Sequence, residues 1–319
     1  MTMTPEQIRL KQNPILTNML LGMGQGTFIA ERIFPRLPQT LSKVVIGQLG
    51  DERFHRYNLR RAPGTATKRV NISYDGKVYT VQQYSVEVPI PRELIREQAE
   101  AKKINLSINV EISEIAMTTA NDILALDYEM EAAEFATDPA SYDPGNVVTL
   151  AGATQWSAAT GTPVTDIRRM REIVRQKIGK RPNTLALSAA AFEALVVNAE
   201  VRSYLPNTQM GPATLEQLKT VFGLDDIAVG DAVWINESDA HADVWGNDAV
   251  LAYVPKILAG GSISLAEPAF GFTNVIEGHP FAETPYYEDN LKSWVYGATF
   301  ERAPNIAYNT AGGLFQNVI

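Results

Sequence analysis

Apolar residues recur at helical spacing over a long central segment of the chain, about residues 107–137. Successive apolar positions lie three or four residues apart, which averages close to one turn of an α-helix. This face consists of Ile108, Ile112, Ile115, Thr119, Ile123, Leu126, Met130 and Ala133. The other face is acidic, and Asp138-Pro139 ends the segment. The pattern predicts a helix of roughly 45 Å with one apolar and one acidic face.

Strand-like alternation precedes this helix. In RVNISYDGKVYTVQQYSVEVPI, residues 69–90, β-branched and aromatic residues alternate with polar ones. Asp75-Gly76 lies between two such runs and is typical of the turn of a β-hairpin. The sequence therefore predicts a long hairpin over residues 51–90 that begins with a basic, loop-like stretch. A hairpin with two polar faces buries little apolar surface, so we do not expect it to be stable alone.

The first 50 residues are rich in proline and glycine, which predicts an extended arm with short helical pieces. Apolar residues of this segment, such as Phe28 and Phe34, have no core of their own to pack on. We therefore expect the arm to lie across another surface.

Helices and strands alternate after Pro163. The pattern predicts helices over 164–179, 189–205 and 214–223, and strands over 183–188, 225–235 and 248–255. Gly179 and Gly223 are the expected ends of the first and third helices. From about residue 265 onward the chain reads as strand and turn. The fold class expected from these elements is α+β.

Charge is distributed in blocks along the chain, although the net charge is only −8. Residues 32–103 contain 14 Lys or Arg and 7 Asp or Glu, whereas residues 104–163 contain 9 acids and no Lys or Arg. A basic block followed by an acidic one suggests surfaces that meet each other, within one chain or between copies. The alternative is that both blocks are simply solvated faces.

Several classes of chemistry lack support in the sequence. Cysteine is absent, which excludes disulfides and zinc sites built on thiolates. No apolar run approaches the ~18 residues of a membrane-spanning helix, so we expect no membrane association. The oxygen-rich stretch ESDAHAD, residues 237–243, lacks the glycine and glutamate that a calcium loop requires. Hydrolase and phosphate-loop motifs are also missing. We therefore predict no enzyme activity and no catalytic, cofactor or metal site.

The glycine-rich stretch LLGMGQGTF, residues 21–29, provides one alternative from the enzyme class. A dinucleotide fingerprint needs G-x-G-x-x-G between a strand and a helix, and Thr27 occupies the third glycine position. A nucleotide-binding enzyme is thus the remote alternative. The glycines are expected to let the arm bend tightly.

The order of these parts resembles the tailed-phage major capsid proteins of the Hong Kong 97 type. The segments that resemble the family, in family order, are TFIAERIFPRLP, DPASYDPGNVVTLAGATQWSAATGTPVTDI, RPNTLALSAAAFEAL, VFGLDDIAVGDAVW, VWGNDAVLAYVP and PAFGFTNV. The resemblance covers nearly the whole chain. It implies the following layout: an N-terminal arm over 1–50, an extended loop over 51–90, a peripheral domain from 91–163 and 265–319 around a spine helix at about 107–137, and an axial domain over 164–264.

The resemblance also implies a function. It predicts a head protein that self-assembles into hexamers and pentamers of an icosahedral shell, without any catalytic residue or cofactor. The shell would enclose double-stranded DNA without sequence-specific binding, in the virion, after assembly in the host cytoplasm. Scaffolding, portal and decoration proteins are the implied further partners. Encapsulins, which form cellular compartments, share this fold and are the alternative.

The charge blocks and the arm together suggest which residues join subunits. We predict that the basic loop of one subunit lies over the acidic helix of the next, with the arm anchored on a neighbour. The predicted contact residues are Phe28, Phe34, Arg53, Arg56, Arg60, Arg61, Lys68, Arg69, Lys77, Glu111, Glu114, Asp122 and Glu129.

Overall fold

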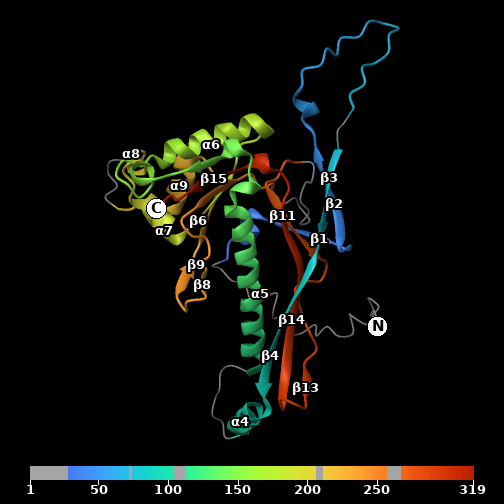
Figure 1. The fold of residues 1–319 in the computed structure, drawn as a ribbon, viewed down its shortest axis with the longest axis vertical. Coiled ribbons are helices and arrows are strands. Elements are labelled where there is room, and N and C mark those ends of the chain that lie inside the picture. The colour runs from blue at the N-terminus through green and yellow to red at the C-terminus, as the bar shows by residue number, and fades with distance from the viewer. Residues whose placement is uncertain (1–27, 72–73, 104–111, 206–210, 257–266) are drawn as a thin grey trace.

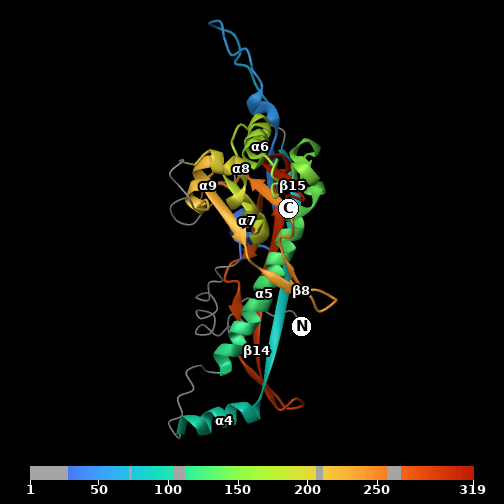
Figure 2. The same cartoon turned by 90° about the vertical axis from the view of Figure 1, so that its left-hand side faces the viewer.

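Two β-sheets and one long helix organise the chain. The computed structural model describes residues 28–71, 74–103, 112–205, 211–256 and 267–319. Helix α5 (Ile112–Thr137) and strands β4 (Gln82–Pro91) and β14 (Ser293–Ile306) run along the long axis of an elongated molecule (Figures 1 and 2). This mixture of elements confirms the predicted α+β class.

The larger sheet has six strands and lies against α5. Its strands are β1 (Arg36–Gln39), β4, β11 (Gly271–Ile276), β12 (Phe281–Ala282), β13 (Tyr286–Glu288) and β14. Strand β14 is central, because β4, β11, β12 and β13 all pair with it, while β1 pairs with β11. Pairing between β14 and β4 extends from Ser293 opposite Pro91 to Arg302 opposite Gln82. Beyond β4, helix α4 (Arg92–Lys103) lies at one end of the molecule (Figure 1).

The smaller sheet has five strands in the order β5-β15-β10-β6-β7. These are β5 (Val147–Thr149), β15 (Gly312–Gln316), β10 (Ala249–Ala252), β6 (Thr184–Ser188) and β7 (Asp226–Gly230). The predicted axial range of 164–264 holds only three of them, since the C-terminal strand β15 lies between β5 and β10. The prediction assigned the chain after residue 265 to the other domain, and the antiparallel pairing of β15 with β10 contradicts that assignment.

Helices cover this smaller sheet where the sequence predicts them. They are α6 (Pro163–Ile178), α7 (Ala189–Val197), α8 (Ala199–Ser203) and α9 (Leu215–Phe222). Gly179 and Gly223 end α6 and α9 in the left-handed conformation, with φ of 72° and 68°, which confirms both predicted helix ends. A small hairpin of β8 (Val233–Ile235) and β9 (His241–Asp243) projects beside α5 (Figure 2).

The predicted hairpin has different partners from those expected. Asp75 and Gly76 lie inside strand β3 (Tyr74–Thr80), which pairs with β2 (Lys43–Leu49), so that Gly76 is opposite Gly47. The prediction of a turn at Asp75-Gly76 is therefore wrong. The described part of the connection between the paired strands, residues 50–71, projects from the top of the molecule (Figure 1). After Val81 the chain continues directly into β4, whose partner is β14.

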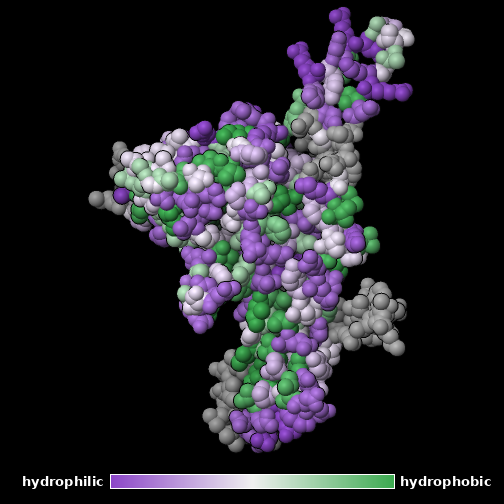
Figure 3. Space-filling model, in the orientation of Figure 1, coloured by the Kyte–Doolittle hydropathy of each residue, from purple (hydrophilic) through white to green (hydrophobic). Residues whose placement is uncertain are grey.

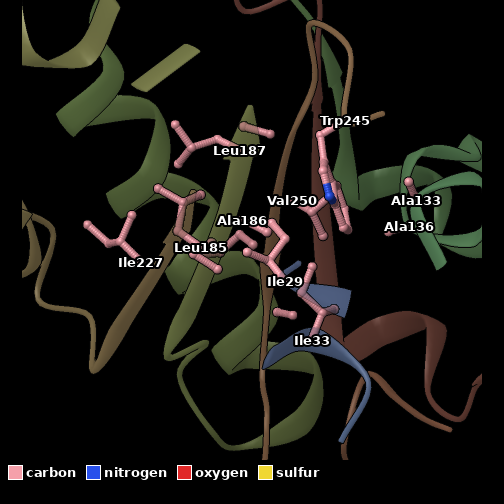
Figure 4. Packing of buried hydrophobic residues seen from close by; sticks show 14 of the residues in the cluster. Ile29, Ile33, Ala133, Ala136, Leu185, Ala186, Leu187, Ile227, Trp245 and Val250 are labelled. Atoms are coloured by element: carbon pink, nitrogen blue, oxygen red, sulfur yellow. The ribbon is translucent and has the colours of Figure 1, made fainter. Parts of the chain in front are cut away.

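Part of the predicted arm belongs to the core of this same chain. Ile29, Ile33 and Phe34 are almost completely buried, around and within the short helix α3 (Ala30–Ile33). Figure 4 shows Ile29 and Ile33 among residues of β6 and β10 such as Ala186 and Val250. The following residues form β1 and β2. The prediction of an arm over residues 1–50 is thus wrong for residues 29–49, which pack and pair within the chain, and residues 1–27 lie outside the described part.

The long helix is present, but a different face of it is buried. The buried residues of α5 are Ala116, Met117, Ala120, Leu124, Tyr128, Glu129, Ala132, Ala133 and Ala136. Of the predicted apolar face, Ile115 and Ile123 are exposed, and Ile108 lies outside the described residues. The sheet accepts the alanine-rich face because small side chains allow the helix to approach closely. No helix among the described residues is long and apolar enough to span a membrane.

Candidate inter-subunit surfaces

The segment 50–71 carries a cluster of basic side chains away from the body of the protein. Its cations Arg56, Arg60, Arg61, Lys68 and Arg69 are all exposed, and Leu59 is 74% exposed between them. We call this segment the basic loop; its surface is largely hydrophilic in Figure 3. Arg53 lies in a short 3-10 helix (Asp51–Phe54) at its start, and Lys77 is exposed on β3. The loop cations thus lie exposed on one projecting element, and their contact with a neighbouring subunit stays a prediction.

Few contacts hold the basic loop within this chain. Arg61 Nη1 donates to Thr67 Oγ1 at 3.1 Å, and the Lys68 ammonium lies 5.7 Å from the ring centre of Tyr57. Phe54 packs its ring against Gly179 at the end of α6, where an added Cβ would lie 3.0 Å from Phe54 Cε1. The base of the loop therefore rests on the body, and its tip contacts only itself among the described residues.

The N-terminal half of α5 exposes an apolar face. Ile115 is 52% and Ile123 is 47% exposed, and Thr119 and Asp122 are exposed beside them. We call these four residues the open face of α5. Figure 3 shows hydrophobic surface over this half of the helix. Large aliphatic side chains left in water are unfavourable, and contiguous apolar surface of this kind marks interaction sites in many proteins.

Only some of the predicted acidic contact residues are accessible. Asp122 is exposed and Glu114 is half-buried, whereas Glu111 lies outside the described residues. Glu129 is completely buried, as is Phe34, so neither side chain has surface to offer a neighbouring subunit. Both are removed from the predicted contact set. Phe28 is half-buried at the edge of the described chain.

Glu129 instead joins three parts of its own chain. Its Oε1 accepts hydrogen bonds from the backbone N–H of Ile29 at 2.8 Å and from Trp245 Nε1 at 2.7 Å, and its Oε2 accepts from the N–H of Ala30 at 2.9 Å. Burial raises the pKa of Glu129 above its ordinary 4.5, although the three donors oppose this rise. The carboxylate thus ties the start of α3 and the segment before β10 to the long helix.

A second buried charge fastens α5 to the larger sheet. Arg302 of β14 is completely buried and pairs with Asp127 at 2.5 Å and Glu131 at 3.2 Å. Its guanidinium lies 3.9 Å from the ring centre of Tyr84 on β4. Burial and the neighbouring Glu131 raise the pKa of Tyr84 to about 12. The acids at 127 and 131 are therefore already paired within the chain.

The sequence contains a signal for Arg302 that the interpretation above did not use. Alternation along β14 places residues 298, 300 and 302 on one face of the strand. Ala298 and Phe300 are buried there, so a cation in the same register requires a buried acidic partner. No comparable signal identifies Glu129, because its three donors come from distant segments of the chain.

Of the two stretches considered above for nucleotide or metal binding, the structure describes only ESDAHAD in full. The glycine-rich stretch at 21–27 lies outside the described residues. In the ESDAHAD segment, Asn236 Oδ1 accepts from the N–H groups of Ser238 and Ala240, which shapes the turn between β8 and β9. Among the described residues, no group of three or more histidine and acidic side chains is arranged to hold a metal ion.

The family model described as phage major capsid protein E matches residues 142–296. The major capsid protein of Burkholderia phage BcepMu is 30% identical over 281 residues, which is 88% of this chain and 88% of that protein. Among solved structures, a phage-related protein from Bordetella bronchiseptica RB50 is 31% identical with a TM-score of 0.78, and the match covers 96% of this chain and 97% of that one.

More distant structures share the fold. The capsid of cyanophage P-SCSP1u is 13% identical with a TM-score of 0.57, over 92% of this chain and 89% of its own. The SrpI encapsulin of Synechococcus elongatus is 12% identical with a TM-score of 0.54, over 99% and 96%. These likenesses support the fold alone, whereas the BcepMu match is close and nearly complete. The capsid resemblance seen in the sequence is confirmed, and the chain belongs to the family of phage major capsid proteins.

Proposed function

We propose that this phage capsid protein self-associates into rings of five and six copies that close into an icosahedral shell around double-stranded DNA. The shell would confine the DNA without reading its sequence. In the proposed layout the extended loop comprises β2, the basic loop and β3, which is residues 43–80. The six-stranded sheet with α5 forms the peripheral domain, and the five-stranded sheet with α6 to α9 forms the axial domain.

The observation that supports assembly is that two surfaces are incomplete in a single chain. The basic loop projects at one end of the molecule, and the N-terminal half of α5 lies toward the other end (Figures 1 and 2). They cannot meet within one copy. Between copies, Leu59 of the loop would cover Ile115 and Ile123 of a neighbour.

Charge complementarity favours the same pairing. The loop carries Arg60 and Arg61, while Asp122 and Glu134 are exposed on α5. Each exposed ion pair would contribute only about 0.2–1 kcal/mol. Repeated around a ring, such pairs would set the register of neighbouring subunits more than they hold them together.

Replacing residues 56–70 by a glycine-serine linker of equal length tests this function. The variant should keep the circular dichroism of the wild type, because the replaced residues contribute nothing to the two sheets. Electron microscopy should show closed shells for the wild type and none for the variant. A matched control replaces the β8–β9 turn, residues 236–240, with the same kind of linker and should still form shells. Shells of normal size from the loop variant would contradict the proposal.

The contents of the particles decide between the two shell functions. A phage shell would lie in the virion, after assembly in the host cytoplasm, with scaffolding, portal and decoration proteins as candidate partners. An encapsulin-like compartment would hold a cargo enzyme instead. Nuclease-protected genomic DNA inside particles from an infected host supports the phage shell, and a stoichiometric enzyme without DNA would support the compartment.

A further inference from the structure

A cationic pocket lies at one end of the smaller sheet, where β6 and β7 begin and β10 ends. Its volume is about 370 Å³. Four cations and two carboxylates line it: Arg171, Lys180, Arg181, Lys256, Asp225 and Glu267. The pocket begins next to Gly179, on which Phe54 at the base of the basic loop packs, and shares no lining residue with the open face of α5.

Two of the four cations are neutralised inside the pocket. Lys180 Nζ lies 3.2 Å from Glu267 Oε1, and Lys256 Nζ lies 3.3 Å from Asp225 Oδ2. Glu267 also accepts a hydrogen bond from the Tyr253 hydroxyl at 2.5 Å. Both carboxylates are thereby engaged, and the two arginines supply the excess positive charge.

Arg171 is held in place but not saturated. Its Nη1 donates to the carbonyl oxygen of Phe222 at 2.5 Å, at the C-terminal end of α9. Gly223 makes room for this contact, since a Cβ there would lie 2.7 Å from Nη1. Arg171 Nε, in contrast, is buried without an acceptor. A buried donor left unpaired is unfavourable, so Arg171 keeps hydrogen-bonding capacity that the described part of its own chain does not use.

Arg181 lines the same pocket with an exposed side chain. The pKa of Glu172 is lowered mainly by its hydrogen bond to Arg175 and also by the charge of Arg181, so one carboxylate outside the lining already acts on Arg181. Burial lowers the pKa of Arg171, the charges of Arg181 and Arg168 lower it further, and the charge of Asp225 opposes this shift. An anion between the two guanidinium groups would relieve the repulsion between their charges. Two arginines in one pocket are suited to binding an oxyanion that carries more than one negative charge.

We propose that this pocket binds a phosphate group, from free inorganic phosphate or from a nucleic acid backbone. Guanidinium groups offer planar pairs of N–H donors that match the oxygens of phosphate. Four cations and two carboxylates give the lining a net charge of +2, which a phosphate dianion would balance and a single carboxylate would balance by half. The ammonium groups of Lys180 and Lys256 at the pocket wall add further donors.

Calorimetric titration of the full chain with inorganic phosphate tests the proposal, with sodium chloride at matched ionic strength as the reference. We expect saturable binding for the wild type. Arg181→Gln should weaken it about tenfold, through the loss of one charge-assisted fork, and Arg181→Glu should abolish it. Arg181 makes no contact on which folding depends, and circular dichroism checks this. Arg96→Gln, which removes an exposed arginine on the distant helix α4, is the matched control.

A second titration with a short DNA strand identifies the source of the phosphate. If Arg181→Glu weakens DNA and phosphate binding together, the ligand is the nucleic acid backbone. If it weakens phosphate binding alone, the ligand is the free ion. The proposal is overturned if the wild type shows no saturable binding at millimolar phosphate, or if Arg96→Gln weakens binding as much as Arg181→Gln.

Discussion

Removing the carboxylate of Glu129 should destabilise the chain strongly, because three buried donors depend on it. Glu129→Ala leaves the N–H groups of Ile29 and Ala30 and the indole N–H of Trp245 without an acceptor. Each unpaired buried donor costs about 1–3 kcal/mol. Water entering the space of the lost side chain would recover part of this, so we expect a loss of about 3–5 kcal/mol.

Glu129→Gln provides a graded comparison. Its amide oxygen can still accept from Ile29 and Trp245, which share Oε1, while its NH₂ group would face the N–H of Ala30. One hydrogen bond is lost and two donors face each other, so we expect a smaller loss of about 1–3 kcal/mol. Native-state hydrogen exchange is the appropriate assay, because it reports the Ile29 and Ala30 amides directly. A glutamine variant less stable than the alanine variant, or an alanine variant within about 1 kcal/mol of wild type, would refute this reasoning.

The same pair of proteins has a predictable pH dependence. The pKa of Glu129 is higher in the folded chain than its ordinary 4.5, so the folded state takes up a proton more readily than the unfolded state. The contribution of this group to stability is therefore full below 4.5 and is lost as pH rises through the folded pKa. The stability of the wild type relative to Glu129→Gln should increase as pH falls from neutrality toward 4.5. A flat difference across that range would contradict the assigned direction.

Four further results are expected. Arg302→Leu should lower the free energy of unfolding, measured by urea titration, by an amount near the lower end of ~3–5 kcal/mol, because Glu131 is then half-buried without its cation while water screens Asp127. No measurable loss would contradict the buried ion pair. The double variant Ile115→Asp, Ile123→Asp should keep its fold but form no shells in sedimentation, whereas Val197→Asp, a change at another exposed aliphatic residue, should still form shells. Normal shells from the double variant would exclude the open face of α5 as an interface. Reversing Arg60, Arg61 and Arg69 to Glu should slow assembly measured by light scattering, and adding Asp122→Lys and Glu134→Lys should partly restore it; a combined variant no faster than the loop reversal would separate the two surfaces. Raising salt from 0.1 M to 1 M should slow wild-type assembly too, since the Debye length falls from about 10 Å to about 3 Å.

Local signals in the sequence were sufficient for elements whose ends depend on nearby residues. Gly179 and Gly223 stop α6 and α9 through their own left-handed backbone conformation, and the buried run Thr184–Ser188 forms β6 as expected. The prediction of a turn at Asp75-Gly76 is wrong because a local turn signal carries no information about a strand that pairs from elsewhere in the chain. The strand that pairs with it, β2, lies in a segment that reads as an arm.

Side-chain size accounts for the other errors. The large aliphatic residues Ile115 and Ile123 dominate any helical pattern, yet the sheet packs on alanines, and the isoleucines remain at the surface. If the protein assembles as proposed, the apolar pattern of α5 reflects contacts between chains as well as packing within one chain. Likewise, the sequence predicts that Phe34 packs on a neighbouring subunit, whereas the core of its own chain covers it. The predicted acidic face is not exposed as a whole, because Glu129 is buried among hydrogen-bond donors about a hundred residues away in sequence.

The uninterrupted passage from β3 through Val81 into β4 has a mechanical consequence. On one side of Val81 the ribbon pairs with β2, and on the other it is held along β14. The N–H of Val81 donates to the carbonyl of Ser42 at 2.9 Å, so both strands of the ribbon leave the body at the same point. The extended loop thus joins the body at Val81, and a rotation about this residue would move the whole loop. A seven-residue strand spans about 24 Å, and a rotation of about 5° at Val81 moves its far end by about 2 Å. In the proposed shell, rings of five and six copies need different angles between neighbours. A rotation at this joint would have to break the hydrogen bond from the Tyr79 hydroxyl to the carbonyl of Ile306 and the contact of Phe54 with Gly179, so bending of the loop is coupled to both contacts.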